Sequence, residues 1–177
     1  MRPTELINIA IHEAGHVAAY LWFEIPFLSV TVIPGIHNNI EYGGRVVGPP
    51  EFPGYKFEED ENGLHRSTIE VLIALLSGEA AEKKLNGNAD MHFVSEHDMK
   101  AIVGTLVELI SDQDIITSYL SKLKMQSKLL FDHQGGLHDD TARWGYVVKL
   151  SDRLQQKKEM SYDECLELYQ SLQIVNS

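Results

Sequence analysis

Two histidines four residues apart, with a glutamate directly after the first, constrain this chain more than any other feature. The segment is His12-Glu13-Ala14-Gly15-His16. It lies in a stretch that predicts one amphipathic helix over 4–23, because apolar residues recur there at three- and four-residue steps. On a helix, residues four apart lie on one face, one turn above the other. Both imidazoles can therefore reach a single Zn²⁺ at about 2.0–2.1 Å.

Glu13 gives this motif a chemical role beyond metal binding. A carboxylate at this place can take a proton from a water molecule that zinc activates, while zinc polarises the carbonyl group under attack. The helical context that the motif requires is present, and the small Ala14 and Gly15 allow another element to approach closely. The alternative interpretation is that these polar residues are partly buried or surface groups of an ordinary amphipathic helix. The motif in its context favours a zinc site with Glu13 as general base.

A catalytic zinc site takes a third ligand from the protein and leaves one position open. Spacing along the chain does not choose that ligand. Asp98 is one candidate, although the pattern Ser95-x-x-Asp98 also fits the cap of a helix, where acidic residues complement the helix dipole. The candidates are histidines and acids that follow the motif, namely Glu79, Glu82, His92, Glu96, His97, Asp98, His133, His138, Asp139 and Asp140.

The rest of the chain predicts a mainly helical α+β fold, in which a zincin-like motif helix joins a small β element and a C-terminal helical bundle. The length of 177 residues fits a single domain over 1–177. β-Branched residues predict short strands over 28–33 and 44–47. Capping and turn signals predict helices over 67–85, 95–110, 111–131 and 140–158, and a last helix that Ser161 opens. The segment 48–63, rich in proline and glycine, predicts a surface loop.

Charge and cysteine content disfavour several classes of protein. The chain has 15 basic and 26 acidic residues and a net charge of −11, whereas nucleic acids and anionic lipid surfaces require a cationic face. A single cysteine, Cys165, cannot form an internal disulfide, which fits a reducing compartment and a buried apolar role. The N-terminus does not read as a signal peptide, and the longest apolar stretch is interrupted by Glu24 and Pro26. We therefore expect a cytoplasmic protein without a membrane span.

Five segments, which occur in order over most of residues 4–131, resemble those of a known protein family. They are IHEAGHV (11–17), SVTVIP (29–34), Gly43-Gly44-Arg45, LLSGEAAEKKLNG (75–87) and SEHDMKA (95–101). In this order they are similar to the zinc-binding helix, the next strand, the substrate-edge strand, the Gly-Gly-Arg-x-Ala-Glu-Glu helix and the Ser-Asn-Asp-Leu segment of the peptidase domain of the FtsH family of ATP-dependent zinc proteases. HEAGH alone is moderately specific, and the ordered combination is much more so.

The resemblance implies a role for residues that spacing leaves undecided. The family's third zinc ligand falls on Asp98, which would join the two histidines of the motif. A family glutamate falls on Glu82, which would orient one of those histidines. Gly43 and Gly44 would lie at a strand that holds an extended polypeptide substrate by adding it to a sheet edge. Their alternative interpretation is a plain turn before a strand.

The chain also departs from the family in ways that limit what the resemblance implies. It contains no Gly-x-x-x-x-Gly-Lys-Ser/Thr phosphate loop and no predicted transmembrane segment, so ATP dependence and membrane attachment are not carried over. Ser77 and Glu79 stand where the family has glycine and arginine, Lys83 replaces its second glutamate, and His97 precedes the ligand position. We therefore expect a zinc endopeptidase for unfolded or flexible polypeptides. A separate ATPase, a regulator and oligomer formation stay open as partners.

Two other functions fit the same residues. A dedicated regulatory protease would cut one partner protein and would differ only in the breadth of its substrates. A non-catalytic metal-binding scaffold or adaptor would keep the fold without the chemistry. Glu13 argues against the scaffold, because a structural zinc site has no need of a general base and prefers four protein ligands.

Overall fold

The structure is a computed structural model that describes residues 3–37, 40–48, 66–87, 96–131 and 140–174. Within these ranges six helices and small antiparallel sheets confirm the mainly helical α+β class. The helices are α1 (Pro3–Trp22), α2 (Arg66–Leu85), α3 (Glu96–Leu109), α4 (Gln113–Leu129), α5 (Asp140–Lys157) and α6 (Tyr162–Ile174). The predicted loop over 48–63 lies, apart from its first residue, outside the described residues.

A small sheet pairs a strand from the C-terminal part of the chain with strands from the N-terminal part. Its strand order is β4 (Arg45–Val47), β1 (Ser29–Thr31) and β5 (Glu159–Ser161), with Val30 opposite both Val46 and Met160. The strands predicted over 28–33 and 44–47 are therefore confirmed as neighbours, although each is shorter than predicted. The ribbon of β2 (Gly35–His37) and β3 (Ile40–Tyr42), and the strand β5, were not predicted, because their segments lack the successive β-branched residues of β1 and β4.

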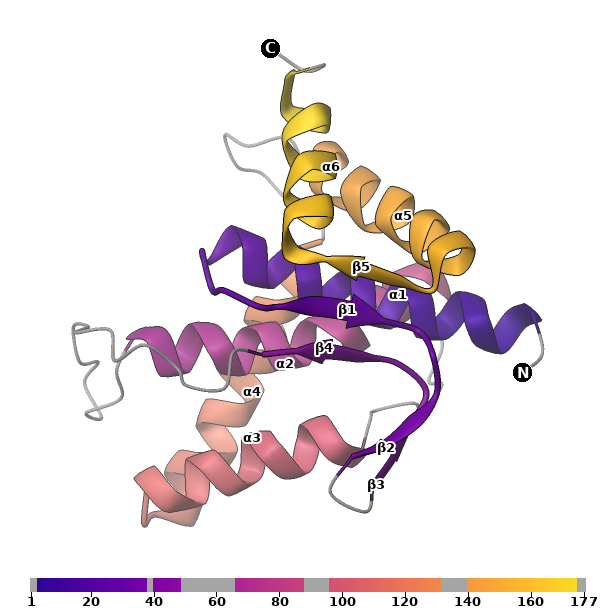
Figure 1. Cartoon of the computed structure of the whole chain (residues 1–177). Helices are drawn as coiled ribbons and strands as arrows, with labels where there is room; N and C mark the ends of the chain where they lie inside the picture. The colour runs from indigo at the N-terminus through magenta and orange to yellow at the C-terminus, as the bar shows by residue number, and fades with distance from the viewer. Residues whose placement is uncertain (1–2, 38–39, 49–65, 88–95, 132–139, 175–177) are drawn as a thin grey trace.

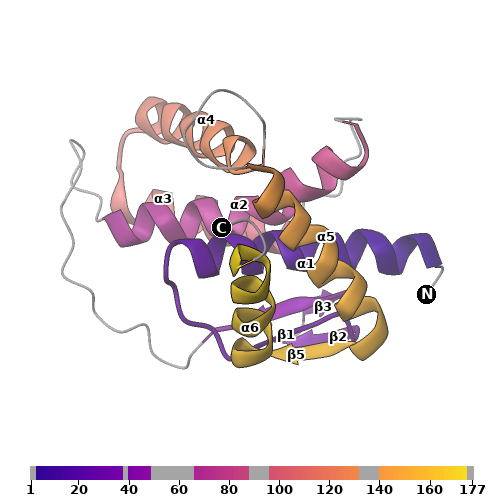
Figure 2. The same ribbon diagram turned by 90° about the horizontal axis from the view of Figure 1, so that it is seen from above.

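Helix α1 runs through the middle of the molecule, between α2 and the sheet, with α5 packed across it (Figures 1 and 2). Its apolar residues join those of β1, α5 and α6 in the main core, which includes Val17, Val30, Leu150 and Met160. Gly15 allows α2 to approach, because a Cβ there would lie 2.5 Å from the carbonyl oxygen of Ser77. The close approach predicted at this residue is therefore confirmed.

A second core packs the middle and C-terminal half of α3 against the other helices. Leu72 and Leu76 of α2, Ile102 and Leu106 of α3, and Leu123 of α4 belong to it, and all are buried. Burying these side chains anchors α3 against α2. The anchor matters for the site, because α3 carries Asp98 in its first turn.

The structure tests the predicted start of a helix at α6 and at α4. At α6 the predicted capping box is confirmed, because the Glu164 backbone N–H donates to the Ser161 hydroxyl and the Ser161 N–H donates to the Glu164 carboxylate. At α4 the helix predicted to begin at Ser111 has its cap one residue later, so the predicted start is wrong by one residue. Asp112 has the extended backbone of a cap, and its carboxylate accepts from the N–H groups of Asp114 and Ile115.

We expect the thiol of Cys165 to be almost inert in the folded protein. The residue is fully buried, and burial raises the pKa of its thiol to about 12. Because the thiolate is the reacting species, labelling by Ellman's reagent at pH 8 should be roughly 1000-fold slower than for an unperturbed thiol. Stopped-flow absorbance with and without guanidinium chloride measures this ratio. Rapid labelling of the native protein would contradict the buried, apolar role.

In the part of the chain that the structure describes, no helix combines the length and the apolar character that a membrane crossing needs.

Candidate metal centre

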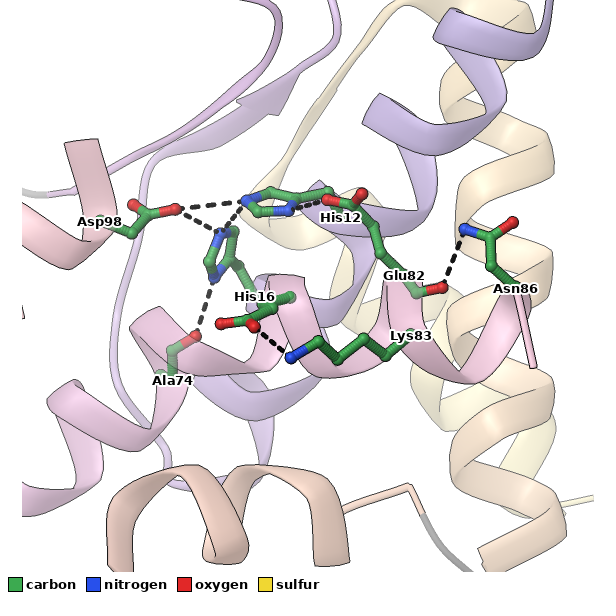
Figure 3. Close-up of polar contacts among 8 residues, drawn as sticks. His12, His16, Ala74, Glu82, Lys83, Asn86 and Asp98 are labelled. Carbon is green, nitrogen blue, oxygen red and sulfur yellow. Dashed lines mark hydrogen bonds and ion pairs between the residues drawn. The ribbon is translucent and has the colours of Figure 1, made fainter. Parts of the chain in front are cut away.

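The two histidines of the motif point from α1 toward α2 and meet at their Nε2 atoms (Figure 3). His12 and His16 are 8% and 5% exposed, and their Nε2 atoms lie 2.9 Å apart. The rings are nearly perpendicular, with centroids separated by 4.5 Å. Two nitrogen atoms thus face the same small space, as the four-residue spacing predicts.

Asp98 reaches this space from the first turn of α3. Its Oδ2 atom lies 3.3 Å from Nε2 of His12 and 3.5 Å from Nε2 of His16. Two ligands of a tetrahedral zinc ion lie about 3.3 Å apart when each is about 2.0–2.1 Å from the metal. Two imidazoles and one carboxylate are also a donor set that zinc accepts. The three residues form a buried group that could hold a metal ion.

Hydrogen bonds at the opposite ring nitrogens hold the imidazoles in this orientation. Nδ1 of His12 donates to the carboxylate of Glu82, and Nδ1 of His16 donates to the carbonyl oxygen of Ala74 at 2.8 Å. Partners of this kind keep Nε2 free for a metal ion and fix the direction of its lone pair. The structure therefore places Glu82 beside a motif histidine, where the resemblance put it. Ala74 was missed, because any residue type can supply a backbone carbonyl.

Gly78 of α2 lies directly against the two ligand nitrogens. A Cβ atom at this position would be 2.5 Å from Nε2 of His16 and 2.7 Å from Nε2 of His12. These contacts are shorter than any side chain tolerates, so the space exists because the residue is glycine. Sequence reasoning did not single out Gly78. The resemblance contained the signal, because Gly78 in the segment 75–87 matches a glycine of the pattern compared there, whereas Ser77 and Glu79 do not match.

The charges around the histidines favour a cation. Burial lowers the pKa of His12, but its hydrogen bonds to Asp98 and Glu82, together with the charges of Glu13 and Glu82, raise that pKa to about 10. Burial acts to raise the pKa of Asp98, yet the two histidines hold it well below its usual range. Without a metal ion, a proton on His12 therefore balances the surrounding carboxylates. A divalent ion would take over that role.

Glu13 lies beside the group and against the beginning of β4. Its carboxyl group is buried, which raises its pKa. A Cβ on Gly44 would lie 2.7 Å from Cγ of Glu13, and one on Gly43 would lie 2.8 Å from a methyl group of Ile9. The structure thus places both glycines where the chain crosses α1 closely. Their contact with a substrate stays a prediction.

Several other sequence candidates lie elsewhere or cannot be placed. Glu79 forms an ion pair with Lys83, one turn along α2, and does not belong to the three-residue group. Glu96 and His97 lie in the first turn of α3 and Asp140 begins α5, and the positions of their side chains are not described. The remaining candidates fall outside the described residues and are His92, His133, His138 and Asp139.

Neither protein-family models nor curated proteins give a match for this chain. The interpretation of the site therefore rests on its geometry.

Proposed function

We propose that this chain is a zinc-dependent endopeptidase that hydrolyses peptide bonds of unfolded or flexible polypeptides, with chemistry similar to that of the FtsH peptidase domain. The observation that carries the proposal is the meeting of His12, His16 and Asp98 in one buried group, with Glu13 on the same helix. A structural zinc site would more often close itself with a fourth protein ligand. Within the described residues this group contains three.

The residues of the site have separate roles in the proposed hydrolysis. Bound zinc would supply a Lewis acid that polarises the substrate carbonyl and makes water easier to deprotonate. Glu13 takes a proton from the attacking water and returns it to the leaving amine. Burial raises the pKa of this carboxyl group, which makes its carboxylate a stronger base. Glu82 and the Ala74 carbonyl keep the two imidazoles aligned.

The edge of the sheet supports a polypeptide as the substrate. Among the described strands, β4 has β1 on one side only, and an extended peptide can add to such an edge through backbone hydrogen bonds. Gly44, just before β4, lies against Glu13. A peptide held along β4 would therefore pass close to the general base. Only an unfolded or flexible segment can adopt this extended form.

Metal analysis tests the site directly. Protein purified without a tag or chelator should contain about one zinc ion per chain by mass spectrometry. Asp98→Ala should lose the ion or bind it at least about 100-fold more weakly, because one of three ligands is gone. Asp152→Ala is the matched control, since it removes an exposed aspartate of α5 and should keep the metal.

Either of two results would contradict this assignment. Wild-type protein that stays empty after zinc is supplied would overturn the metal site, and with it the peptidase. Zinc held equally tightly by Asp98→Ala would keep a metal site but show that another residue is the third ligand. Cleavage of casein by the zinc-loaded protein would favour a broad peptidase over one dedicated to a single partner.

A further inference from the structure

Helix α1 carries a tyrosine one turn beyond the metal group and on the same side. Successive helical residues are turned by about 100°, so Tyr20 lies about 40° from His16 and about 20° from Glu13 when viewed along the axis. It therefore falls between the second histidine and the general base. The distance along the axis from His16 is about 6 Å, and helical side chains lean toward the N-terminus, which directs this ring toward His16.

The ring of Tyr20 is packed against other side chains, whereas its hydroxyl group has no hydrogen-bond partner among the described residues. The ring meets Phe27 edge to face, with centroids 6.1 Å apart, and packs against two clusters of buried residues. Among the described residues, no protein group forms a hydrogen bond with its hydroxyl. Every fully buried side-chain oxygen or nitrogen of these residues has a partner, so the Tyr20 hydroxyl must reach solvent. It is a fixed donor to which no described residue supplies an acceptor.

The charged residues of the site affect the pKa of this hydroxyl group. Burial, followed by the charges of Asp98 and Glu13, raises the pKa of Tyr20 to about 12. The phenol therefore keeps its proton throughout the pH range in which a general base such as Glu13 would act. A neutral phenol can donate one hydrogen bond to a group that gains negative charge.

We propose that Tyr20 is a catalytic hydrogen-bond donor, which binds the carbonyl oxygen of the scissile peptide as that oxygen becomes negative. The role rests on the proposed peptidase function. As the water oxygen bonds to the carbonyl carbon, the C=O π electrons move onto the carbonyl oxygen and Glu13 takes the proton of the water. Tyr20 donates its hydrogen bond to that oxygen and keeps its own proton. Such donors act mainly in the transition state and so affect kcat more than KM.

Tyr20→Phe tests this role, because it removes one oxygen atom and keeps the ring against Phe27. With a fluorescence-quenched peptide taken from a casein cleavage site, kcat should fall roughly 10²- to 10³-fold and KM should change little. A phosphinic peptide mimics the tetrahedral oxygen without being cleaved, and zinc-loaded Tyr20→Phe should bind it at least about 10-fold more weakly by calorimetry. Zinc content and melting temperature should stay at wild-type values.

Tyr162→Phe is the matched control. Tyr162 also meets Phe27 edge to face, at 5.0 Å between centroids, but it belongs to α6 and lies outside the metal group. This variant should cleave and bind the phosphinic peptide like the wild type.

Three results for Tyr20→Phe would overturn the role. They are an unchanged kcat with unchanged phosphinic-peptide affinity, a change in KM alone, and a loss of zinc or of melting temperature that accounts for the lost activity. A different result separates this role from the function on which it rests. Wild-type protein that holds zinc but neither cleaves casein nor binds the phosphinic peptide would overturn the peptidase itself, and the Tyr20 role with it.

Discussion

Glu13→Gln is expected to lower the rate of casein cleavage by roughly 1000-fold while one zinc ion per chain is retained. Glutamine has nearly the same size as glutamate and fills the same buried space, but its amide cannot accept a proton from water at neutral pH. Glu13 does not belong to the three residues whose ligand atoms lie together, so the metal should stay. Release of fluorescent fragments from labelled casein measures the rate, and mass spectrometry measures the zinc.

The same experiment separates an enzyme from a scaffold. Glu108→Gln is the control, because it removes one exposed carboxylate from α3 and should leave cleavage unchanged. Equal cleavage by Glu13→Gln and wild type would remove the proposed mechanism. A wild-type protein that holds zinc and cleaves nothing would instead support the non-catalytic scaffold. Loss of zinc in Glu13→Gln would place Glu13 among the groups that hold the metal.

Gly78→Ala is expected to weaken zinc binding by at least about 100-fold and to abolish cleavage. The added methyl group would lie 2.5–2.7 Å from the Nε2 atoms of His12 and His16, so both rings would have to move. They cannot move freely, because Glu82 and the Ala74 carbonyl hold their Nδ1 atoms. Losing a partner of a ligand histidine typically costs about 10- to 100-fold in metal affinity, and a clash with the ligand atoms should cost at least as much.

A helical glycine with open space around it provides the control for this substitution. A Cβ on Gly104 of α3 would meet nothing within 4 Å, so Gly104→Ala should keep zinc and stabilise the fold by up to about 1 kcal/mol. Competition with a chromogenic zinc chelator measures the affinity of each variant, and thermal unfolding measures stability. Gly78→Ala with wild-type zinc affinity would show that the metal lies elsewhere.

Local patterns in the sequence sufficed to predict the helices and the two histidines of the site. The spacing of His12 and His16 predicts that both imidazoles share a helix face, because that relation depends only on helical geometry. The periodicity over 4–23 predicts α1 with small errors at its ends. The cap of α4 was missed by one residue, since Ser111 and Asp112 both suit a cap and only the backbone conformation distinguishes them.

Those patterns could not predict contacts between segments that are far apart in the sequence. Asp98 is 86 residues from His12 in sequence, and spacing left it among ten candidates until the family resemblance favoured it. Glu82 likewise depended on the resemblance. The strand β5 forms only because the end of α5 returns beside β1, where Glu159–Ser161 can pair with it.

The sequence by itself determined a motif helix with two histidines and a glutamate, the mainly helical class and a short strand pair, because each depends on residues close together in the chain. The tertiary structure alone decided which carboxylate meets the histidines, that the Ala74 carbonyl aligns His16, that Gly78 leaves room at the ligand nitrogens, and that no described residue accepts a hydrogen bond from the Tyr20 hydroxyl. These relations depend on how α2 and α3 pack against α1. Burial of apolar side chains drives that packing, and such burial has no preferred direction or sequence distance.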